Sequence, residues 1–325
     1  MNRLYISLSL LFGLFSIAQA GASLPGALVE TDWLAKNRDK VVILDVRNDV
    51  KSFTQKPVYK KDKKSGKSKL VKVGGHIPGA RLVNYKNVRA TRMIDGKKVT
   101  RMVPARKDFQ EFMQSVGLNK NDSIVIVSKG ESNGDMTMAT RLYWQLKYFG
   151  HKNLAILNGG TAQWIVDKRE VSSKADKPKK GNWVATTEDK SIFATSEDVA
   201  SAVQSKDTQL VDTRSISLYL GTWYKSSYVY DKGHIDGARN YPNELITKPS
   251  LPARFISSGD TKALMDKLGI DTSAKSITYC NSGHLASGSW FLMSEVLGNK
   301  DVKLYDGSMH EWTLEKRPTT SVTAK

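Results

Sequence analysis

The stretch SITYCNSGHLASGSW, residues 276–290, predicts a strand, a loop and a helix in direct succession. Its first four residues favour a strand, and residues 286–298 carry apolar side chains at helical spacing until a glycine ends the pattern. Cys280, the only cysteine of the 325 residues, therefore lies at the carboxyl end of a strand, where open α/β sheets bind their ligands. The thiol is either a reactive nucleophile or a small, inert core residue.

The chain around this stretch is an internal repeat. Four blocks occur twice in the same order: VVILDVR (41–47) and TQLVDTR (208–214), GGHIPGAR (74–81) and KGHIDGAR (232–239), VGLNKNDSIVIVS (116–128) and LGIDTSAKSITYC (268–280), and FGHKNLAILNGGTAQW (149–164) and LGNKDVKLYDGSMHEW (297–312). Short β-branched runs at residues 41–44, 124–127 and 154–157 alternate with helix-like stretches such as 139–148. This alternation predicts two α/β domains, each with a mainly parallel sheet flanked by helices.

Composition sets the expected boundaries of these domains. Residues 1–20 have a basic start, an apolar centre and a small-residue ending, which is typical of a signal peptide cleaved near Ala20. The apolar run is too short to span a bilayer comfortably, although a retained anchor is the alternative. The polar, proline-containing residues 171–182 predict a linker between domains at 21–170 and 183–325. We therefore expect an exported, periplasmic protein with no stable membrane insertion after signal cleavage.

The formal net charge of +18 raises the question of a nucleic-acid partner. The densest basic run, YKKDKKSGKSKLVK at residues 59–72, is polar and loop-like, has little aromatic interleaving and accompanies no nucleic-acid motif. We expect a solvated basic surface and no nucleic-acid partner, while attraction to anionic substrates or to an anionic membrane surface stays open. The five histidines show no metal-ligand spacing, so neither a metal nor another cofactor is expected.

The tandem Asp-x-Arg, Gly-His-Ile-x-Gly-Ala and strand-cysteine-loop-helix blocks resemble the two-domain rhodanese family of sulfurtransferases. The resemblance covers nearly the whole chain after residue 20. It implies two tandem, doubly wound domains, of which only the C-terminal one is catalytic, with Cys280 cycling through a persulfide. It also implies a small anionic sulfur donor of the thiosulfate or 3-mercaptopyruvate class, and a thiophilic acceptor such as cyanide or a thiol.

The loop after the cysteine is the predicted substrate-binding site. It comprises Asn281, Ser282, Gly283, His284, Leu285 and Ala286. A glycine permits a tight turn, and backbone N–H groups converging at a helix N-terminus would stabilise a thiolate or a persulfide anion. The cysteine, Gly283 and Ala286 match the loops of both thiosulfate-using and mercaptopyruvate-using members, and Ser282 matches the latter. The other three residues match neither, and His284 is either an acid–base group or a loop histidine that points to solvent.

The second domain departs from the family pattern after Asp212 and Arg214. Two-domain members usually carry Arg-Phe-x-Gly there, and its arginine helps to hold the anionic substrate. Here Leu218 stands at the arginine position, which predicts weaker binding of thiosulfate or of a carboxylate. The nearby tyrosine-rich residues 222–233 either line a different pocket or form a packed, half-exposed loop.

Residues that recur in both halves are interpreted as structural, because the first half has no cysteine. They are His76 and His234, together with the pairs Asp45–Arg47 and Asp212–Arg214. We expect each pair to form a buried, charge-assisted contact, and we count Asp212 and Arg214 also as residues bordering the substrate pocket. The position of the cysteine falls at Val127 or Ser128 in the first half, before a longer loop at residues 129–140, so we predict a catalytically silent first domain.

Three functions compete for this pattern. The leading prediction is a sulfurtransferase that moves sulfane sulfur from a donor through a Cys280 persulfide to an acceptor. A cysteine phosphatase would need Cys-x5-Arg to grip phosphate, but Ala286 stands at the arginine position. A non-catalytic binding or persulfide-carrier module is the remaining alternative, favoured by Leu218 and opposed by the retained cysteine and Gly283.

Overall fold

Two five-stranded sheets organise the molecule. The computed structural model describes residues 23–323, so the predicted signal peptide lies outside the described residues. The first sheet has the order β1-β9-β8-β2-β5, with β1 (Leu28–Val29), β2 (Val42–Arg47), β5 (Arg81–Asn84), β8 (Ile124–Val127) and β9 (Leu154–Leu157). The second has the order β10-β14-β13-β11-β12, with β10 (Phe193–Ala194), β11 (Gln209–Asp212), β12 (Arg239–Asn240), β13 (Ser276–Tyr279) and β14 (Val302–Tyr305). All neighbours in both sheets are parallel, which confirms the predicted α/β fold in two copies.

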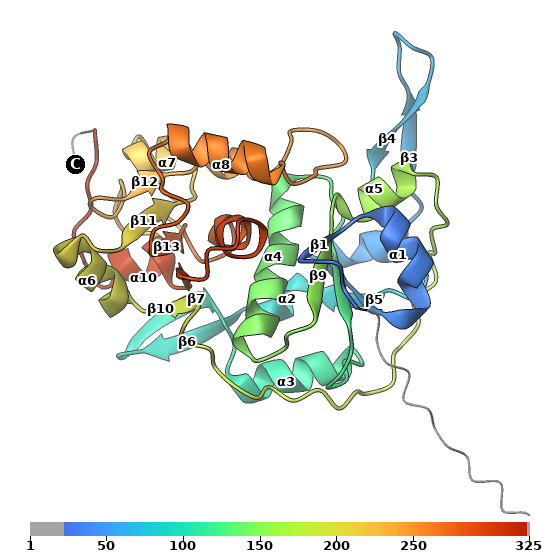
Figure 1. Ribbon diagram of the computed structural model, residues 1–325, viewed down its shortest axis with the longest axis horizontal. Helices are drawn as coiled ribbons and strands as arrows, with labels where there is room; N and C mark the ends of the chain where they lie inside the picture. Colours follow the sequence, from blue (N-terminus) through green and yellow to red (C-terminus); the bar gives the residue numbers. More distant parts are fainter. Residues whose placement is uncertain (1–22, 324–325) are drawn as a thin grey trace, which may run out of the picture.

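Helices flank each sheet (Figure 1). The first domain contains α1 (Thr31–Asn37), α2 (Tyr85–Val88), α3 (Arg106–Ser115), α4 (Asn133–Tyr148) and α5 (Gly160–Val166), with short turns η1 (Arg38–Lys40) and η2 (Val50–Thr54). The second contains α6 (Ser196–Ser205), α7 (Ile216–Leu220), α8 (Ser258–Lys267), α9 (Ala286–Phe291) and α10 (Ser308–Leu314), with η3 (Asn243–Leu245) and a π-helical turn η4 (Leu292–Val296). Strands β8 and β13 are buried along their whole length, as parallel strands covered on both faces require.

Helix α4 lies in the middle of the molecule and packs on α9 of the other domain (Figure 1). Its first turn is capped by the Ser132 hydroxyl, which accepts a hydrogen bond from the amide of Asp135 at 3.2 Å. The prediction of a long loop at residues 129–140 is therefore wrong, because α4 begins at Asn133, directly after its capping residue. One apolar core runs across the boundary, so the two domains share buried surface.

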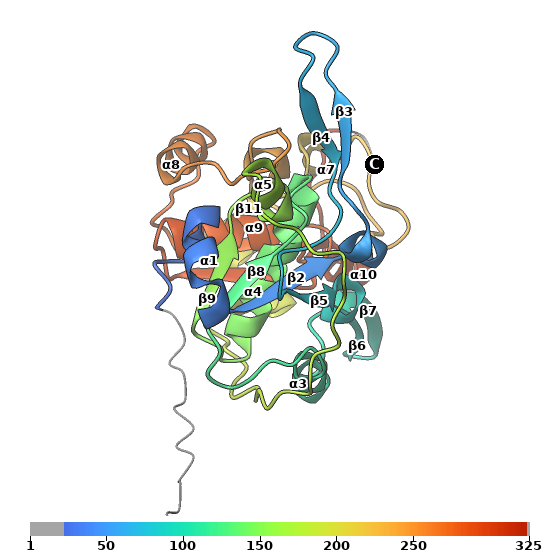
Figure 2. The same cartoon turned by 90° about the vertical axis from the view of Figure 1, so that its right-hand side faces the viewer.

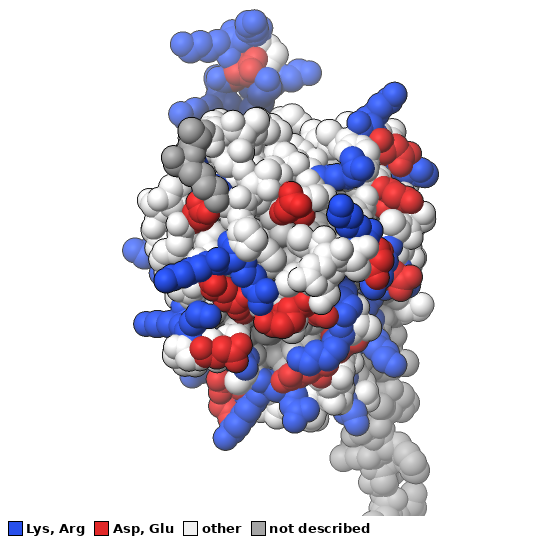
Figure 3. All heavy atoms as spheres, turned by 90° about the vertical axis from the view of Figure 1, so that its left-hand side faces the viewer, with Lys and Arg blue, Asp and Glu red and all other residues white. Residues whose placement is uncertain are grey.

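A hairpin of β3 (Val58–Lys61) and β4 (Ser68–Lys72) projects from the first domain (Figures 1 and 2). The expectation of a loop in residues 59–72 is wrong. The Asp62 carboxylate accepts a hydrogen bond from the Ser65 amide and pairs with Lys69 across the turn, and these contacts close the hairpin. Figure 3 shows lysines gathered on the projection, while charges of both signs alternate over the visible face of the body.

A second hairpin, β6 (Ala90–Ile94) and β7 (Lys97–Met102), extends from the first domain along the second (Figure 1). Its two-residue turn is Asp95-Gly96, with φ of 47° and 77°. Positive φ at both positions is the requirement of a type I′ turn, for which Asp-Gly is a preferred sequence. Strand β7 contacts α10, so this hairpin carries first-domain residues onto the second domain.

The predicted linker, residues 171–182, runs along the surface of the first domain. Ser172 forms an antiparallel bridge with His76, and the Gly181 amide donates to the carbonyl of Gln114 at 2.8 Å. Trp183, which follows, is buried against Phe109. Among residues 23–323, no helix combines the length and the apolar character needed to cross a membrane.

Candidate active site

Cys280 directly follows β13, a strand that lies between β11 and β14. The predicted strand has the observed bounds, and α9 begins at Ala286, as expected from the sequence. The cysteine is 2% exposed, and the loop of residues 281–285 connects it directly to α9. The structure therefore places the thiol at the carboxyl edge of the sheet, as the sequence predicted.

Ser308, at the start of α10, holds the loop from behind. Its hydroxyl accepts hydrogen bonds from the amides of Cys280 at 3.1 Å and Gly283 at 3.0 Å, and it donates to the Tyr305 carbonyl at 2.8 Å. The amides of the next two residues of α10 donate to the carbonyls of Cys280 and Asn281, both at 3.1 Å. Sequence reasoning missed this serine, although it lies in the last repeated block, because its contacts exist only in the folded domain.

The amide arrangement around the sulfur differs from the expected cradle. Only the Ser282 amide donates to Sγ among the described residues, at 3.5 Å. The amides of Cys280 and Gly283 bind Ser308 instead, so the expectation that several N–H groups converge on Sγ itself is wrong. In the described part of the chain, the amides of His284, Leu285 and Ala286 donate to no protein acceptor.

Gly283 is required on two grounds. Its φ of 69° lies in the left-handed region that side chains disfavour. A β-carbon there would lie 2.5 Å from Nη1 of Arg141 and 2.7 Å from Oδ1 of Asp306. Those two fully buried residues form an ion pair, and Arg141 also donates to the Gly283 carbonyl at 3.2 Å. An arginine of α4 therefore holds the cysteine loop across the domain boundary, a role that the sequence did not indicate.

His284 packs toward the first domain. Its Nε2 lies 3.1 Å from Oγ1 of Thr137 and 3.2 Å from the carbonyl oxygen of Gly134, and its ring centroid is 5.0 Å from that of Tyr85. Burial, reinforced by the nearby charges of Arg89 and Arg141, lowers the pKa of His284 to about 3. The imidazole is therefore neutral near pH 7, and the interpretation of a solvent-pointing loop histidine is wrong.

The tyrosine-rich residues 222–233 divide between the two predicted roles. The Tyr228 ring centroid lies 3.8 Å from Cζ of Arg101 and 5.6 Å from the ring centroid of His310, whose amide donates to the Asn281 carbonyl. This tyrosine therefore packs beside a residue that holds the cysteine loop, and burial raises its pKa, whereas Trp223 and Tyr230 are half exposed. Leu218, at the position of the missing arginine, is buried in α7.

The repeated Asp-x-Arg motifs form buried ion pairs, as predicted. Arg47 contacts Asp45 at 2.6 Å and Arg214 contacts Asp212 at 2.5 Å, with all four side chains fully buried. Each arginine also donates at 2.7 Å to the carbonyl of the glycine before the repeated histidine. Nδ1 of His76 and Nδ1 of His234 each donate to a backbone carbonyl oxygen at 2.8 Å, which fits the predicted structural role. Asp212 and Arg214 thus brace the sheet edge beside the cysteine.

The remaining substrate-binding candidates lie around the same loop. Ser282 is buried, and its side chain lowers the pKa of Tyr228 against the larger, opposite effect of burial. Leu285 packs against the shared apolar core, and Ala286 is fully buried at the start of α9. The Asn281 side-chain oxygen is buried without a hydrogen-bond partner, so it is a free acceptor close to the cysteine. The structure therefore brings all six loop residues together around one turn.

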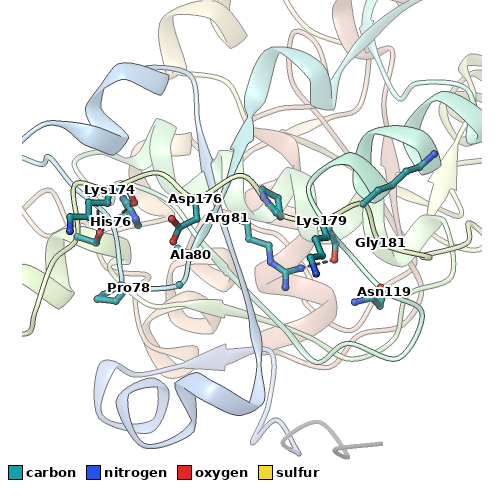
Figure 4. A pocket seen from close by; sticks show the side chains of 14 residues that line it. His76, Pro78, Ala80, Arg81, Asn119, Lys174, Asp176, Lys179 and Gly181 are labelled. Carbon is teal, nitrogen blue, oxygen red and sulfur yellow. Dashed lines mark hydrogen bonds between the residues drawn. The ribbon is translucent and has the colours of Figure 1, made fainter. Parts of the chain in front are cut away.

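An open pocket of about 400 Å³ adjoins the loop. It is lined by Asn48, Asp49, Tyr85, Arg89, Lys129, Ser132, Gly134, Asp135, Met138 and His284. A separate cavity of about 490 Å³ lies between the first domain and the linker and contains none of the predicted substrate-binding residues (Figure 4). Within residues 23–323, no group of three or more His, Cys, Asp or Glu side chains is placed to hold a metal ion.

Comparison with known proteins identifies similar sequences and folds. A family model described as a rhodanese-like domain matches residues 30–167 and again residues 195–315. A thiosulfate sulfurtransferase of Cricetulus griseus is 32% identical over 254 residues, covering 76% of this chain and 80% of the relative. The sulfur carrier protein TtuD of Thermus thermophilus is 29% identical over 302 residues, covering 90% and 95%. The crystal structure of SseA from Escherichia coli, a 3-mercaptopyruvate sulfurtransferase, has a TM-score of 0.69 at 23% identity, covering 87% and 98%.

Proposed function

Because the chain belongs to the rhodanese family and is a rhodanese-type sulfurtransferase, we propose that Sγ of Cys280 takes up the transferred sulfur atom as a persulfide and passes it on. The observation that carries this proposal is the position of the only thiol of the chain. It follows the central strand β13 in a glycine-turned loop, and that loop lies within the second matched domain. The equivalent residue of the first domain, Ser128, is fully buried and donates to the sulfur of Met136, so one domain carries the chemistry.

The proposed reaction has two half-reactions. The Cys280 thiolate attacks the outer sulfur of thiosulfate, the S–S bond of the donor breaks, and sulfite leaves with the bonding electron pair. With 3-mercaptopyruvate, the C–S bond breaks and the carbon keeps the electron pair and takes up the thiol proton, which gives pyruvate. The acceptor then attacks the outer sulfur of the persulfide, the S–S bond breaks, and the Cys280 thiolate leaves with the bonding electron pair; cyanide gives thiocyanate, and a thiolate gives a new persulfide.

The loop supports this chemistry with backbone donors. The Ser282 amide already reaches Sγ, and the amides of His284, Leu285 and Ala286, which follow in the same loop, donate to no other acceptor among the described residues. Backbone N–H groups at the start of a helix stabilise an anion there. The neutral His284 is bound to α4, so it positions the loop and supplies no positive charge near pH 7.

A persulfide-carrier role is the second candidate. The observation that favours it is Leu218, which replaces the substrate-holding arginine of the family pattern with a buried, uncharged side chain. The relative named as a sulfur carrier protein matches most of this chain, so the same fold serves that role elsewhere. The two candidates differ in whether a small molecule or another protein completes the transfer.

The test is sulfur loading measured by intact mass. The protein and its Cys280→Ser variant, both produced from residue 21, are treated separately with thiosulfate and with 3-mercaptopyruvate, and thiocyanate is measured after cyanide is added. We expect the wild type to gain one sulfur atom and to release thiocyanate, and the serine variant to do neither. A wild type that gains no sulfur from either donor would contradict the proposal. Sulfur gain without turnover on small acceptors, but with transfer to a protein thiol, would establish the carrier role.

A further inference from the structure

The hairpin β6–β7 is fixed against the catalytic domain by specific contacts. The Thr100 amide donates to Nε2 of His310 at 3.0 Å, and the Val103 amide donates to Oδ2 of Asp306 at 2.6 Å. His310 lies in α10, whose first turn holds the cysteine loop, and Asp306 is the partner of Arg141. The hairpin therefore has a defined position relative to the sulfur and is no free surface arm.

Arg89 directly precedes this hairpin and Arg101 lies in its strand β7, and both guanidinium groups lie on aromatic rings. Cζ of Arg101 lies 3.8 Å from the ring centroid of Tyr228, and Cζ of Arg89 lies 4.4 Å from that of Tyr85. Among the described residues, neither arginine forms an ion pair or a side-chain hydrogen bond. Nε of Arg89 and Nη1 of Arg101 are buried without an acceptor. A buried, unsatisfied donor of a cation is costly unless an anion binds it, so these groups indicate a site for an anionic ligand.

The two tyrosines connect these arginines with the cysteine loop. The ring centroid of Tyr85 lies 5.0 Å from that of His284 in the cysteine loop, and burial raises the pKa of Tyr85 to about 12. The ring centroid of Tyr228 lies 5.6 Å from that of His310, whose amide donates to the Asn281 carbonyl of the same loop at 3.1 Å. Each ring therefore packs on an arginine on one side and on a residue of the loop, or on a residue that holds the loop, on another. The Tyr85 hydroxyl is buried without a partner, which adds a neutral donor to the same space.

The backbone of Arg101 is strained in a way that points to function. Its φ is 67°, in the left-handed region that a residue with a β-carbon rarely adopts. Such conformations persist where the surrounding contacts impose them, and they concentrate at ligand sites. Here the neighbouring Thr100 is held by His310, so the strained strand backbone directs the arginine onto Tyr228.

We propose that Arg89 and Arg101, supplied by the first domain, bind the oxyanion of the sulfur donor beside Cys280, in place of the arginine that the second domain lacks at Leu218. The inference rests on the proposed function of Cys280 and names the residues that select its donor. The ligand is a small sulfur-bearing anion with a sulfonate or a carboxylate group, which an arginine fork binds through two parallel hydrogen bonds. The first domain then contributes to specificity although it carries no nucleophile.

The loading test uses charge-removing variants of the two arginines. Arg89→Gln, Arg101→Gln and the double variant are compared with Lys98→Gln, which removes an exposed charge from the same hairpin. Each arginine variant should slow sulfur loading from the preferred donor by about tenfold to a hundredfold, and the double variant by more. Arg101→Lys should lose less than Arg101→Gln because it keeps the charge. All variants at position 101 keep a β-carbon, so the backbone strain is unchanged, and thermal unfolding checks that each one folds.

A binding measurement separates this inference from the proposed function. In the Cys280→Ser background, calorimetry measures the affinity for sulfite and for pyruvate, the anions that the two donors release. We expect one of these anions to bind, to lose at least about tenfold in affinity in the double arginine variant, and to keep it in Lys98→Gln. Loading and anion affinity that both match Lys98→Gln would overturn the arginine site. Arginine-dependent anion binding without any sulfur gain on Cys280 would instead overturn the proposed function and leave the anion site standing.

Discussion

At the residue scale, the cysteine loop depends on one backbone conformation. Gly283 combines a left-handed φ with direct contact to the buried Arg141–Asp306 pair. The same turn directs its amide to Ser308 and its carbonyl to Arg141. A residue with a β-carbon would disturb the turn and the ion pair together, so the glycine of the loop is a structural condition for the position of the sulfur.

Gly283→Ala tests this dependence, with Gly237→Ala as its control. Gly237 also has a left-handed φ, of 72°, but a β-carbon there meets no atom within 4 Å. The control should lose only about 1 kcal/mol of unfolding free energy, the cost of a left-handed backbone for a residue with a β-carbon. It should keep its sulfur loading. Gly283→Ala should lose about 2–4 kcal/mol and at least about tenfold in loading, because the clash adds to the strain. Equal losses in urea unfolding and in loading would contradict a specific role for Gly283.

At the element scale, α10 combines the support of the loop with a buried carboxyl group. Glu311 is 4% exposed, and burial raises its pKa from 4.5 to about 7, with the charges of Glu315, Asp306 and Glu197 adding to the effect. The folded state therefore binds this proton more tightly than the unfolded state does. The stability that this bound proton adds to the folded state is fully present below about pH 4.5 and is lost as the pH rises through about 7.

Glu311→Gln should remove this pH dependence. The glutamine has a similar shape and stays neutral, so the variant should gain stability relative to the wild type as the pH rises from about 5 to about 8. The gain is at most about 1.4 kcal/mol per pH unit within that range. Urea unfolding of both proteins at the two pH values measures it. A stability difference that is the same at both pH values would show that Glu311 does not titrate in this range.

Sequence patterns predicted the buried elements better than the exposed ones. Strands β8, β9 and β13 have the predicted bounds, because short β-branched runs that are buried on both faces have few alternative structures. The hairpin β3–β4 was missed because its strands are exposed and rich in lysine, so no alternation of apolar and polar residues marks them. The start of α4 was missed because one side chain, Ser132, decides it.

At the scale of the whole molecule, the catalytic loop is held by both domains. Arg141 of α4 and Asp306 after β14 are fully buried and paired, and Asp306 also accepts the Val103 amide. The sequence could single out Cys280 as the candidate nucleophile because the repeat isolates the cysteine. It could not identify Arg141, Arg89 or Arg101, because their role exists only when two distant segments meet across the boundary.

Arg141→Met should be among the most destabilising single changes. It leaves the Asp306 carboxylate buried without its cation, which costs about 3–5 kcal/mol. Asp306→Asn in the same chain removes that charge, so the double variant should be more stable than Arg141→Met alone. Urea unfolding of the two single variants and the double variant measures the coupling. Strictly additive losses would contradict a direct interaction between the two side chains.

The solitary thiol described at the outset also restricts how a catalytic cycle ends. With no second cysteine in the chain, a persulfide on Cys280 has no internal thiol that could displace its outer sulfur and close a disulfide. The outer sulfur therefore cannot be displaced by a second cysteine of the same chain, and no intramolecular disulfide can form. Each loaded chain would keep the persulfide until a nucleophile from outside the chain attacks its outer sulfur. The concentration and reactivity of the acceptor would therefore set how long the persulfide lasts.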